Sequence, residues 1–335
     1  MAVQEFVYPE DISIPDDFPE KDYAKSKVKP TIEQTGKFGQ LKLFVTELFF
    51  LCNYWDPVKI PNLTVLYIGA GPGHHLVTLT KMFPTVTWEL YDLQTFAPGL
   101  ESQQNVKLFE RYFEDSDIPR YAGRTDVFLI CDIRNLTYKQ GDVKWSWANE
   151  KKVIEDMQLQ ESWVLNMKPI FSSLKFRLPY AEKEVIENLG NTWKYLDGTV
   201  YIQPWVGETS SETRLIVDGA NLKIRAWYFP KFEKQMFYHN KIRRLQRYKS
   251  NYIVNYDSRT TSLSSQADKV RKSPKQTTDF VLSDYYDSVV TMETLAHYLR
   301  RTYGPSKSKN PELLERLVKS LILPITNIDD SEEQD

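Results

Sequence analysis

The sequence predicts an α/β fold in which helices flank a doubly wound, mostly parallel sheet. Short apolar runs typical of strands alternate with helical stretches along the 335 residues, and a glycine-rich turn follows the first apolar run. Alternating β and α units are typical of a parallel sheet, with ligands bound at the carboxyl ends of its strands. We therefore expect one sheet-based domain with its binding site at that edge.

The elements can be placed by their periodicity. Apolar residues in residues 39–55 recur with the spacing of an amphipathic helix. Strand-like runs follow at "LTVLYIG", "VTWELYD", "NVKLFE", "TDVFLICD", "SSLKFRL", "TVYIQPW", "TRLIVDG" and "KIRAWYF". Further helical stretches are expected at residues 73–82, 150–167, 291–301 and 311–321.

Three segments are expected along the chain. Residues 1–36 are rich in Pro, Asp, Glu and Lys and predict an extended, weakly ordered N-terminal arm. Residues 37–323 form a single domain, in which residues 256–279 are expected to be a polar surface loop. The acidic residues 324–335 predict a disordered tail.

Composition excludes several classes of protein. No stretch approaches the roughly 18 apolar residues of a membrane span, and the first residues lack a signal peptide, so a cytoplasmic protein is expected. Cys52 and Cys131 lie in apolar runs and predict buried free thiols. The four histidines and two cysteines lack metal-ligand spacing, so no metal is expected.

The turn "GAGPGHH" indicates a nucleotide-type cofactor. Gly69, Gly71 and Gly73 let a ligand approach the backbone where a strand ends. His74 stands where a dinucleotide fingerprint has its third glycine, which makes a dehydrogenase the weaker interpretation. Asp92 ends the next strand and suits the ribose hydroxyls of S-adenosylmethionine. A purely structural turn remains an alternative.

Four charged residues interrupt or end apolar elements, where burial is costly unless charges are paired. They are Lys42, Asp132, Lys175 and Glu212. A structural ion-pair network is one explanation. In this order, however, the four resemble the catalytic tetrad of ribose 2'-O-methyltransferases.

The resemblance extends beyond the tetrad. The stretches "GQLKLFVTELFFL", "VLYIGAGPGHH", "LICDIRN", "SSLKFRLPY" and "EKQMFYHNKI" resemble the poxvirus cap-specific mRNA 2'-O-methyltransferases, which also serve as the small, processivity subunit of poly(A) polymerase. The similarity runs from about residue 23 to residue 323. It implies a viral protein with a Rossmann-like, S-adenosylmethionine-dependent methyltransferase fold, located in the host cytoplasm or the virion.

The implied reaction transfers a methyl group from S-adenosylmethionine to the 2'-OH of the first transcribed nucleotide of N7-methylguanosine-capped mRNA. The implied partners are the capped mRNA 5' end and, in a heterodimer, a poly(A) polymerase catalytic subunit. Two alternatives stay open. One is a non-catalytic RNA-binding subunit of that polymerase, and the other is a 2'-O-methyltransferase acting on uncapped, structured RNA.

The resemblance also assigns site residues. The tetrad falls on Lys42, Asp132, Lys175 and Glu212. The cofactor site falls on Gly69, Gly71, Gly73, Asp92, Tyr112, Phe113 and Asp132. The cap pocket falls on Tyr23, Tyr180, Glu182 and Glu233, where Tyr180 and Glu182 replace a Phe and an Asp of the family.

A basic segment is expected to bind the RNA strand. Residues 221–275 contain 14 Lys and Arg against 3 Asp and Glu, although the whole chain has a net charge of −2. Aromatic residues are interleaved with these cations, a mixture that suits phosphate contacts and base stacking; a solvated charged helix is the alternative. The candidates for backbone contacts are Arg177, Lys241, Arg243, Arg244 and Arg247.

Lys175 is expected to be the general base or the final proton acceptor. Its ammonium pKa must then fall from about 10.4 towards neutrality. Burial and the nearby Lys42 lower this pKa, whereas Asp132 and Glu212 raise it while holding the amine.

Overall fold

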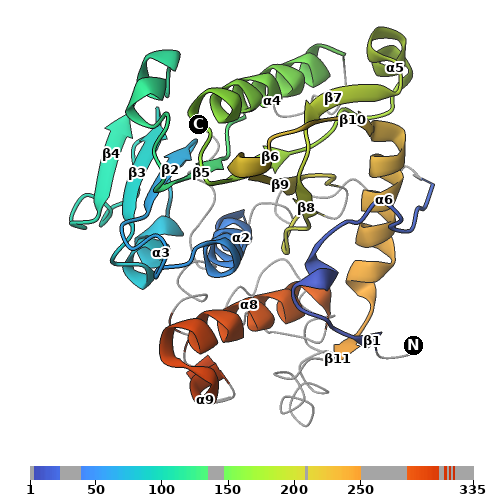
Figure 1. The fold of residues 1–335 in the computed structure, drawn as a ribbon. Coiled ribbons are helices and arrows are strands. Elements are labelled where there is room, and N and C mark those ends of the chain that lie inside the picture. Colours follow the sequence, from blue (N-terminus) through green and yellow to red (C-terminus); the bar gives the residue numbers. More distant parts are fainter. Residues whose placement is uncertain are drawn as a thin grey trace.

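The computed structural model describes residues 4–22, 39–134, 147–207, 210–249 and 285–308, together with residues 313, 314, 317 and 320. A seven-stranded sheet of order β4-β3-β2-β5-β6-β9-β8 forms its centre (Figure 1). The strands are β2 (Thr64–Ile68), β3 (Thr87–Asp92), β4 (Val106–Glu110), β5 (Val127–Cys131), β6 (Phe171–Phe176), β8 (Thr199–Tyr201) and β9 (Thr213–Asp218). The predicted α/β fold is confirmed.

The sheet is parallel from β4 to β6 and antiparallel from β6 through β9 to β8. Because β9 runs in the opposite direction, its first residues lie at the same edge as the carboxyl ends of β2, β3, β5 and β6. This topology explains how Glu212, just before β9, reaches the edge where Asp132 ends β5.

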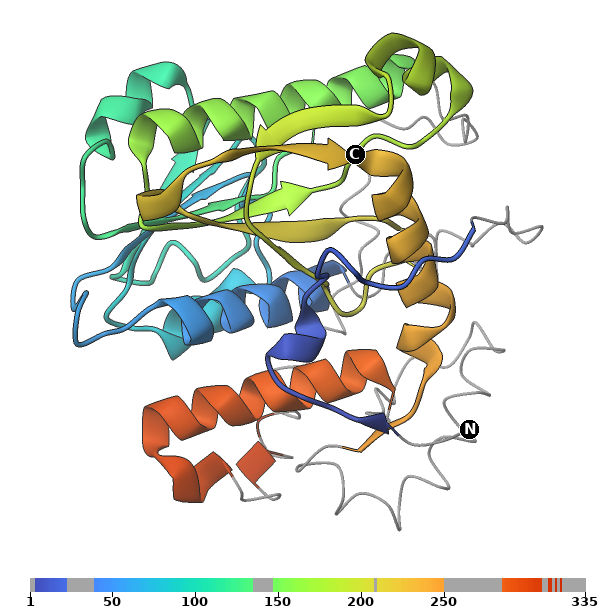
Figure 2. The same cartoon turned by 45° about the vertical axis from the view of Figure 1, so that its right-hand side comes forward.

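Helices cover both faces of the sheet (Figure 2). On one face lie α2 (Gly39–Tyr54) and α3 (Leu76–Met82), with α8 (Tyr286–Tyr303) packed beneath α2. On the other lies α4 (Trp147–Met167). Strand β2 sends Val65 and Tyr67 into the first core and Leu66 and Ile68 into the second. A strand buried on both faces is apolar at every position, which makes it recognisable in the sequence.

A second, antiparallel sheet joins β7 (Thr192–Leu196) to β10 (Ile224–Tyr228). The helices α5 (Lys183–Leu189), α6 (Phe229–Lys241) and α9 (Pro305–Ser308) complete the larger elements. The chain leaves α6 through the 3₁₀ turn η4 (Arg243–Leu245) into β11 (Tyr248–Lys249).

The N-terminal arm is more ordered between residues 4 and 22 than its composition predicts. Its strand β1 (Gln4–Glu5) pairs with β11, and a 3₁₀ turn, η1 (Glu10–Ile12), follows. Phe6, Ile12 and Phe18 are buried in the core. Apolar side chains at irregular intervals therefore fasten this extended segment to the domain.

Several expectations fall outside the described residues. These are Tyr23, the loop at residues 256–279, the tail at residues 324–335 and most of the helix at residues 311–321. Within the described ranges, no helix combines the length and the apolar character needed to cross a bilayer. The same ranges contain no cluster of three or more His, Cys, Asp or Glu side chains suited to a metal ion. Cys52 and Cys131 are free and buried, as predicted.

Candidate active site

The glycine turn lies at the carboxyl end of β2 and touches the ends of the two neighbouring strands. Gly69 has φ +79°, and a Cβ there would lie 2.9 Å from the backbone carbon of Asp132 after β5. A Cβ on Gly71 would lie 2.7 Å from Cγ of Asp92 at the end of β3. Gly73 also has a positive φ, +73°. The turn therefore forms a bare backbone cradle packed directly against neighbouring protein atoms, where any larger side chain would clash.

Asp92 is held in place by this cradle. Its Oδ2 accepts a hydrogen bond from the Gly71 backbone N–H at 2.9 Å, and its Oδ1 accepts one from the Gln94 N–H at 2.9 Å. Each carboxylate oxygen keeps further acceptor capacity. The carboxylate is thus oriented at the sheet edge beside the glycine turn.

The four tetrad candidates lie together. Lys42, at the start of α2, is 2.8 Å from Glu212 through Nζ and Oε1. Lys175 Nζ, on β6, is 3.1 Å from Asp132 Oδ1 and 3.6 Å from Glu212 Oε2. Lys175 is thus held between two carboxylates, with only 12% of its side chain exposed.

Two arginines complete the cluster and were missed in the sequence. Arg214 lies opposite Lys175 in the β6–β9 register, and its Nη2 is 2.6 Å from Asp132 Oδ1. Its Nη1 donates to the carbonyl oxygen of Cys131 at 3.0 Å, and its side chain is 1% exposed. The guanidinium of Arg134 lies 3.9 Å from a carboxylate oxygen of Glu212 and 3.9 Å from one of Asp156. A cation within the apolar run "TRLIV" was the available signal for Arg214.

The electrostatics keep both carboxylates ionised. Burial disfavours the charged form of Asp132, but the charges of Arg214 and Lys175 outweigh burial and lower its pKa. At Glu212, neighbouring positive charges likewise outweigh the effect of burial, so its pKa falls well below its usual range. At Lys175, burial lowers the ammonium pKa although Asp132 and Glu212 oppose it. In this cluster, burial makes the Lys175 ammonium easier to deprotonate, whereas Asp132 and Glu212 stay ionised.

The two aromatic residues expected near the cofactor base differ in their surroundings. Tyr112 is exposed, whereas Phe113 is buried in the core. The Phe113 ring packs edge-on against Tyr91 and Trp163, with ring centroids 5.2 Å apart in each case. The exposed ring of Tyr112 is the one that the structure presents to solvent.

The residues expected in the cap pocket gather where β6 leads into α5. Glu233, on α6, accepts a hydrogen bond from the Ala181 backbone N–H at 2.9 Å. Burial raises the Glu233 pKa, the Ala181 N–H lowers it, and the neighbouring Glu182 raises it further. Tyr180 is half-buried and Glu182 is exposed. Tyr180, Glu182 and Glu233 therefore lie close together.

Arg177 joins this group of residues through an ion pair. Its guanidinium donates to both carboxylate oxygens of Glu150 on α4, at 3.1 and 3.2 Å, and stacks 4.5 Å from the Tyr180 ring centroid. Glu150 also accepts the Tyr180 backbone N–H at 3.2 Å. Arg177 and Glu150, both buried, orient the backbone and ring of Tyr180.

Besides Arg177, two of the cations expected to contact RNA form ion pairs within the fold. Arg243 Nη2 donates to the Asp11 carboxylate at 2.7 Å, which secures the N-terminal arm. Arg244 binds Asp287 of α8 through two nitrogens, at 2.7 and 2.9 Å from Oδ2. Lys241 and Arg247 lie at the end of α6 and just before β11, and both are half-buried.

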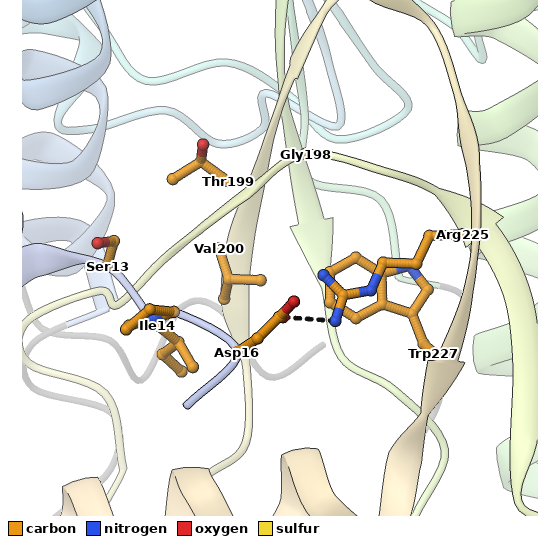
Figure 3. Close-up of a pocket in the computed structure, with 9 residues that line it drawn as sticks. Ser13, Ile14, Asp16, Gly198, Thr199, Val200, Arg225 and Trp227 are labelled. Atoms are coloured by element: carbon orange, nitrogen blue, oxygen red, sulfur yellow. Dashed lines mark hydrogen bonds and ion pairs between the residues drawn. The ribbon is translucent and has the colours of Figure 1, made fainter. Parts of the chain in front are cut away.

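A hollow of about 260 Å³ lies apart from this cluster, between the N-terminal arm and the strands β8 and β10 (Figure 3). Arg225 stacks 4.2 Å from the Trp227 ring centroid there and lies 2.6 Å from Asp16. No tetrad or glycine-turn residue lines the hollow. The candidate active site is therefore the sheet edge and not this hollow.

Comparison with known proteins places the chain in a family. The family model described as "Poly A polymerase regulatory subunit" matches residues 4–264. A Myxoma virus (strain Lausanne) protein named cap-specific mRNA (nucleoside-2'-O-)-methyltransferase is 27% identical over 322 residues, covering 92% of this chain and 83% of the relative. A Fowlpox virus (strain NVSL) protein with the same name is 30% identical over 236 residues, covering 66% of this chain and 72% of the relative. The chain belongs to the poly A polymerase regulatory subunit family.

Proposed function

We propose that the protein transfers a methyl group from S-adenosylmethionine to the ribose 2'-OH of the first transcribed nucleotide of N7-methylguanosine-capped mRNA. The names of the viral relatives support this reaction. The main structural support is the position of the Lys175 amine, which lies 3.1 Å from Asp132 and 3.6 Å from Glu212 at the sheet edge beside the glycine turn. This arrangement is what proton removal from a positioned hydroxyl requires.

The cradle fits the methyl donor. Gly69, Gly71 and Gly73 let the turn pack closely against Asp132 and Asp92, and the Asp92 carboxylate beside them would accept hydrogen bonds from two ribose hydroxyls. S-adenosylmethionine, when bound, supplies an electrophilic methyl group on a sulfonium. No protein group has to become covalently bonded to the methyl group.

The protein's own part is positioning and proton transfer. Bound S-adenosylmethionine would supply its methyl group to the 2'-oxygen and leave as a neutral thioether, and the neutral Lys175 amine would accept the hydroxyl proton. Asp132 and Glu212 fix the amine, and Lys42 fixes Glu212 at 2.8 Å. Holding the reacting atoms in line is the larger contribution, because it removes the entropic cost of bringing them together.

A transfer assay with labelled S-adenosylmethionine tests the proposal. Capped RNA should accept the methyl group, and otherwise identical uncapped RNA should accept little. Equal transfer to both would favour a methyltransferase for structured RNA. No transfer to either would favour a non-catalytic RNA-binding subunit.

Asp92→Ala should weaken S-adenosylmethionine and S-adenosylhomocysteine alike, because both carry the same ribose. The expected loss of binding free energy is about 1.5–3 kcal/mol, the usual contribution of hydrogen bonds to a charged group. Titration calorimetry with each ligand measures this loss. Glu110→Ala is the matched control, since Glu110 is an exposed carboxylate at the end of the neighbouring strand β4, directly opposite Asp92 in register. Unchanged affinity for both ligands in Asp92→Ala would remove Asp92 from the ribose site.

The rate of methyl transfer at saturating substrate should rise with pH and then level off. Lys175 accepts a proton only when neutral, so the rate follows the neutral fraction of its amine. Because burial lowers the Lys175 pKa, the midpoint should lie below the ordinary value of 10.5. The lowered pKa values of Asp132 and Glu212 keep both carboxylates ionised across this range. A rate that is constant from about pH 6 to 10 would contradict a proton-accepting Lys175.

Wild-type protein should bind N7-methylguanosine-capped RNA more tightly than RNA with an unmethylated cap. A positive charge on the base strengthens stacking on the Tyr180 ring by about 1–2 kcal/mol when desolvated, or roughly 5- to 30-fold in affinity. Tyr180→Ala and Glu233→Gln should lose this preference and retain salt-dependent binding of uncapped RNA. Fluorescence anisotropy with the three RNAs measures both effects.

Glu187→Gln is the control for the cap experiment, because Glu187 is an exposed carboxylate on nearby α5. The raised Glu233 pKa adds a further expectation: the preference should fade as the pH falls through that pKa, because protonation removes an acceptor from the pocket. A preference that survives in both Tyr180→Ala and Glu233→Gln would place the pocket on other residues.

We further propose that the protein acts as a subunit of a poly(A) polymerase heterodimer. The description of its family supports this partner. Co-purification of the untagged polymerase catalytic subunit with tagged protein from infected cells tests it. We propose that Arg177, Lys241, Arg243, Arg244 and Arg247 contact the RNA backbone through their positive charges; Arg243 and Arg244 also form ion pairs within the fold.

A further inference from the structure

A cluster of buried polar side chains links α2, which carries Lys42, to the glycine turn. Its members are Gln40, Glu47, Tyr67 and His75, each no more than 5% exposed. Gln40 and Glu47 are two turns apart on α2 and therefore lie on one face. His75 directly precedes α3, two residues after the turn glycine Gly73, and Tyr67 lies on β2 two residues before Gly69. The cluster thus joins the elements that surround the tetrad.

The hydrogen bonds around His75 specify its protons. The His75 backbone N–H donates to Oε1 of Gln40 at 3.0 Å, so the Gln40 atom facing His75 must be its carbonyl oxygen. The same oxygen lies 2.7 Å from Nδ1 of the imidazole. A carbonyl oxygen only accepts, so Nδ1 must carry a proton.

The other side of the imidazole then shares a single proton with Glu47. Nε2 lies 3.0 Å from Glu47 Oε2, while the Tyr67 hydroxyl donates to Glu47 Oε1 at 2.6 Å. A bare Nε2 facing an ionised Glu47 would leave two buried acceptors in contact, and protonation of both would leave an uncompensated buried charge. One proton between Nε2 and Oε2 satisfies every atom.

The cluster also adjoins the tetrad electrostatically. The charges that act on the Tyr67 hydroxyl are those of Glu47, Asp132 and Arg214. Arg214 forms an ion pair with Asp132 at 2.6 Å and also interacts electrostatically with Glu47. The Glu47–His75 pair therefore lies next to the active site.

We propose that Glu47 and His75, sharing one buried proton, are positioning residues that hold the glycine turn against the helix carrying Lys42. The proposal rests on the proposed methyltransferase function for its consequences, although the protonation pattern can be tested without it. Loss of the pair should loosen the cofactor turn and let Lys42 shift relative to Glu212. Both cofactor affinity and turnover should then suffer.

The protonation pattern is tested by two-bond ¹H–¹⁵N correlation spectra of the protein labelled with ¹⁵N-histidine. The His75 signals are identified by their loss in His75→Asn. The expected result is a protonated Nδ1, with Nε2 either protonated beside an ionised Glu47 or bare beside a protonated one. A bare Nδ1 with a protonated Nε2 would overturn the proposal whatever the protein's function is.

The positioning role is tested with two variants of Glu47. Glu47→Gln can accept from Tyr67 and donate to Nε2, so it should bind S-adenosylhomocysteine within about threefold of wild type. Glu47→Ala removes both contacts, and we expect affinity to fall by about tenfold or more, with a lower kcat. Rescue by the amide distinguishes positioning from a mere requirement for charge.

Leu295→Ala on α8 is the stability control, because Leu295 is fully buried but belongs to neither the turn nor α2. It should lower the melting temperature and leave the affinity unchanged at temperatures where the protein stays folded. Glu47→Ala with wild-type affinity, or Glu47→Gln as damaged as Glu47→Ala, would overturn the positioning role. If wild-type protein bound no S-adenosylhomocysteine, the proposed function would fail, while the histidine spectra would still decide the shared proton.

Discussion

Lys175→Met should lower the rate of methyl transfer by about 10²- to 10⁴-fold, the usual contribution of a positioned acid or base. Methionine keeps an unbranched apolar stem and removes the amine that lies 3.1 Å from Asp132. S-adenosylhomocysteine affinity should stay within a few-fold, because the cradle is formed by other residues. Single-turnover transfer to capped RNA, together with calorimetry, measures the two effects.

The control for this variant is Lys59→Met, since the Lys59 side chain is 81% exposed and its Nζ lies 3.6 Å from the exposed carboxylate of Asp56. Its rate should equal that of wild type. A Lys175→Met protein that keeps more than about a tenth of the wild-type rate would remove Lys175 from the role of base, given the size of such contributions.

Arg214→Met should destabilise the fold and impair the reaction together. Removing one partner of a buried ion pair costs about 3–5 kcal/mol, because the other charge stays buried. Here Asp132 would lose its 2.6 Å partner and the Cys131 carbonyl would lose its donor. We expect a loss of about 3 kcal/mol in unfolding free energy, at the lower end because Lys175 still faces Asp132.

The catalytic consequence of Arg214→Met is a shift in pH dependence. Without Arg214, Asp132 interacts more strongly with the Lys175 ammonium and raises its pKa. The pH at which the rate of methyl transfer rises should therefore be higher in this variant. Part of its activity should return in alkaline buffer. An unshifted limb, measured at a temperature where the variant is folded, would contradict this coupling.

Arg225→Met is the matched control for Arg214→Met. Arg225 also lies on a β-strand and pairs with an aspartate at 2.6 Å, but its side chain is 35% exposed and that of Asp16 is 77% exposed. Exposed pairs contribute about 0–1 kcal/mol. Urea unfolding of both variants compares the two environments directly.

The strands of the central sheet were predictable because burial leaves a direct mark on their composition. All five residues of β2 and of β5 are buried, so β5 is apolar throughout and β2 is apolar after Thr64. The run "TWKYL" of β7 was missed because only its last two residues are buried and Lys194 interrupts it. Helix α5 was missed in the sequence analysis for a similar reason. Val185 is its only buried residue, so its apolar residues form no helical period.

The tetrad could be anticipated because a charged residue in an apolar strand is conspicuous. Arg214 gave the same signal, and its role became visible only when the antiparallel β6–β9 pairing placed it opposite Lys175. The buried cluster of Glu47 and His75 gave no such signal, because Glu47 lies on a helix and His75 directly before one, where polar residues are ordinarily solvated.

The cations of the basic segment show the limit of counting charges. Arg243 and Arg244 stand in a strongly basic stretch, yet their partners are Asp11 and Asp287, from distant parts of the chain. Charge density along a sequence says nothing about such long-range pairing. The interleaving of aromatic residues and cations in this segment remains our reason to propose that it binds RNA.

One measurement tests both the position and the substrate of methylation. N7-methylguanosine-capped RNA is incubated with the protein and S-adenosylmethionine, digested with nuclease and analysed by mass spectrometry. We predict a single added methyl group on the ribose of the first transcribed nucleotide, absent with Lys175→Met and absent from uncapped RNA. Methylation at internal riboses, or no methylation by a folded protein that binds both ligands, would contradict the proposed function.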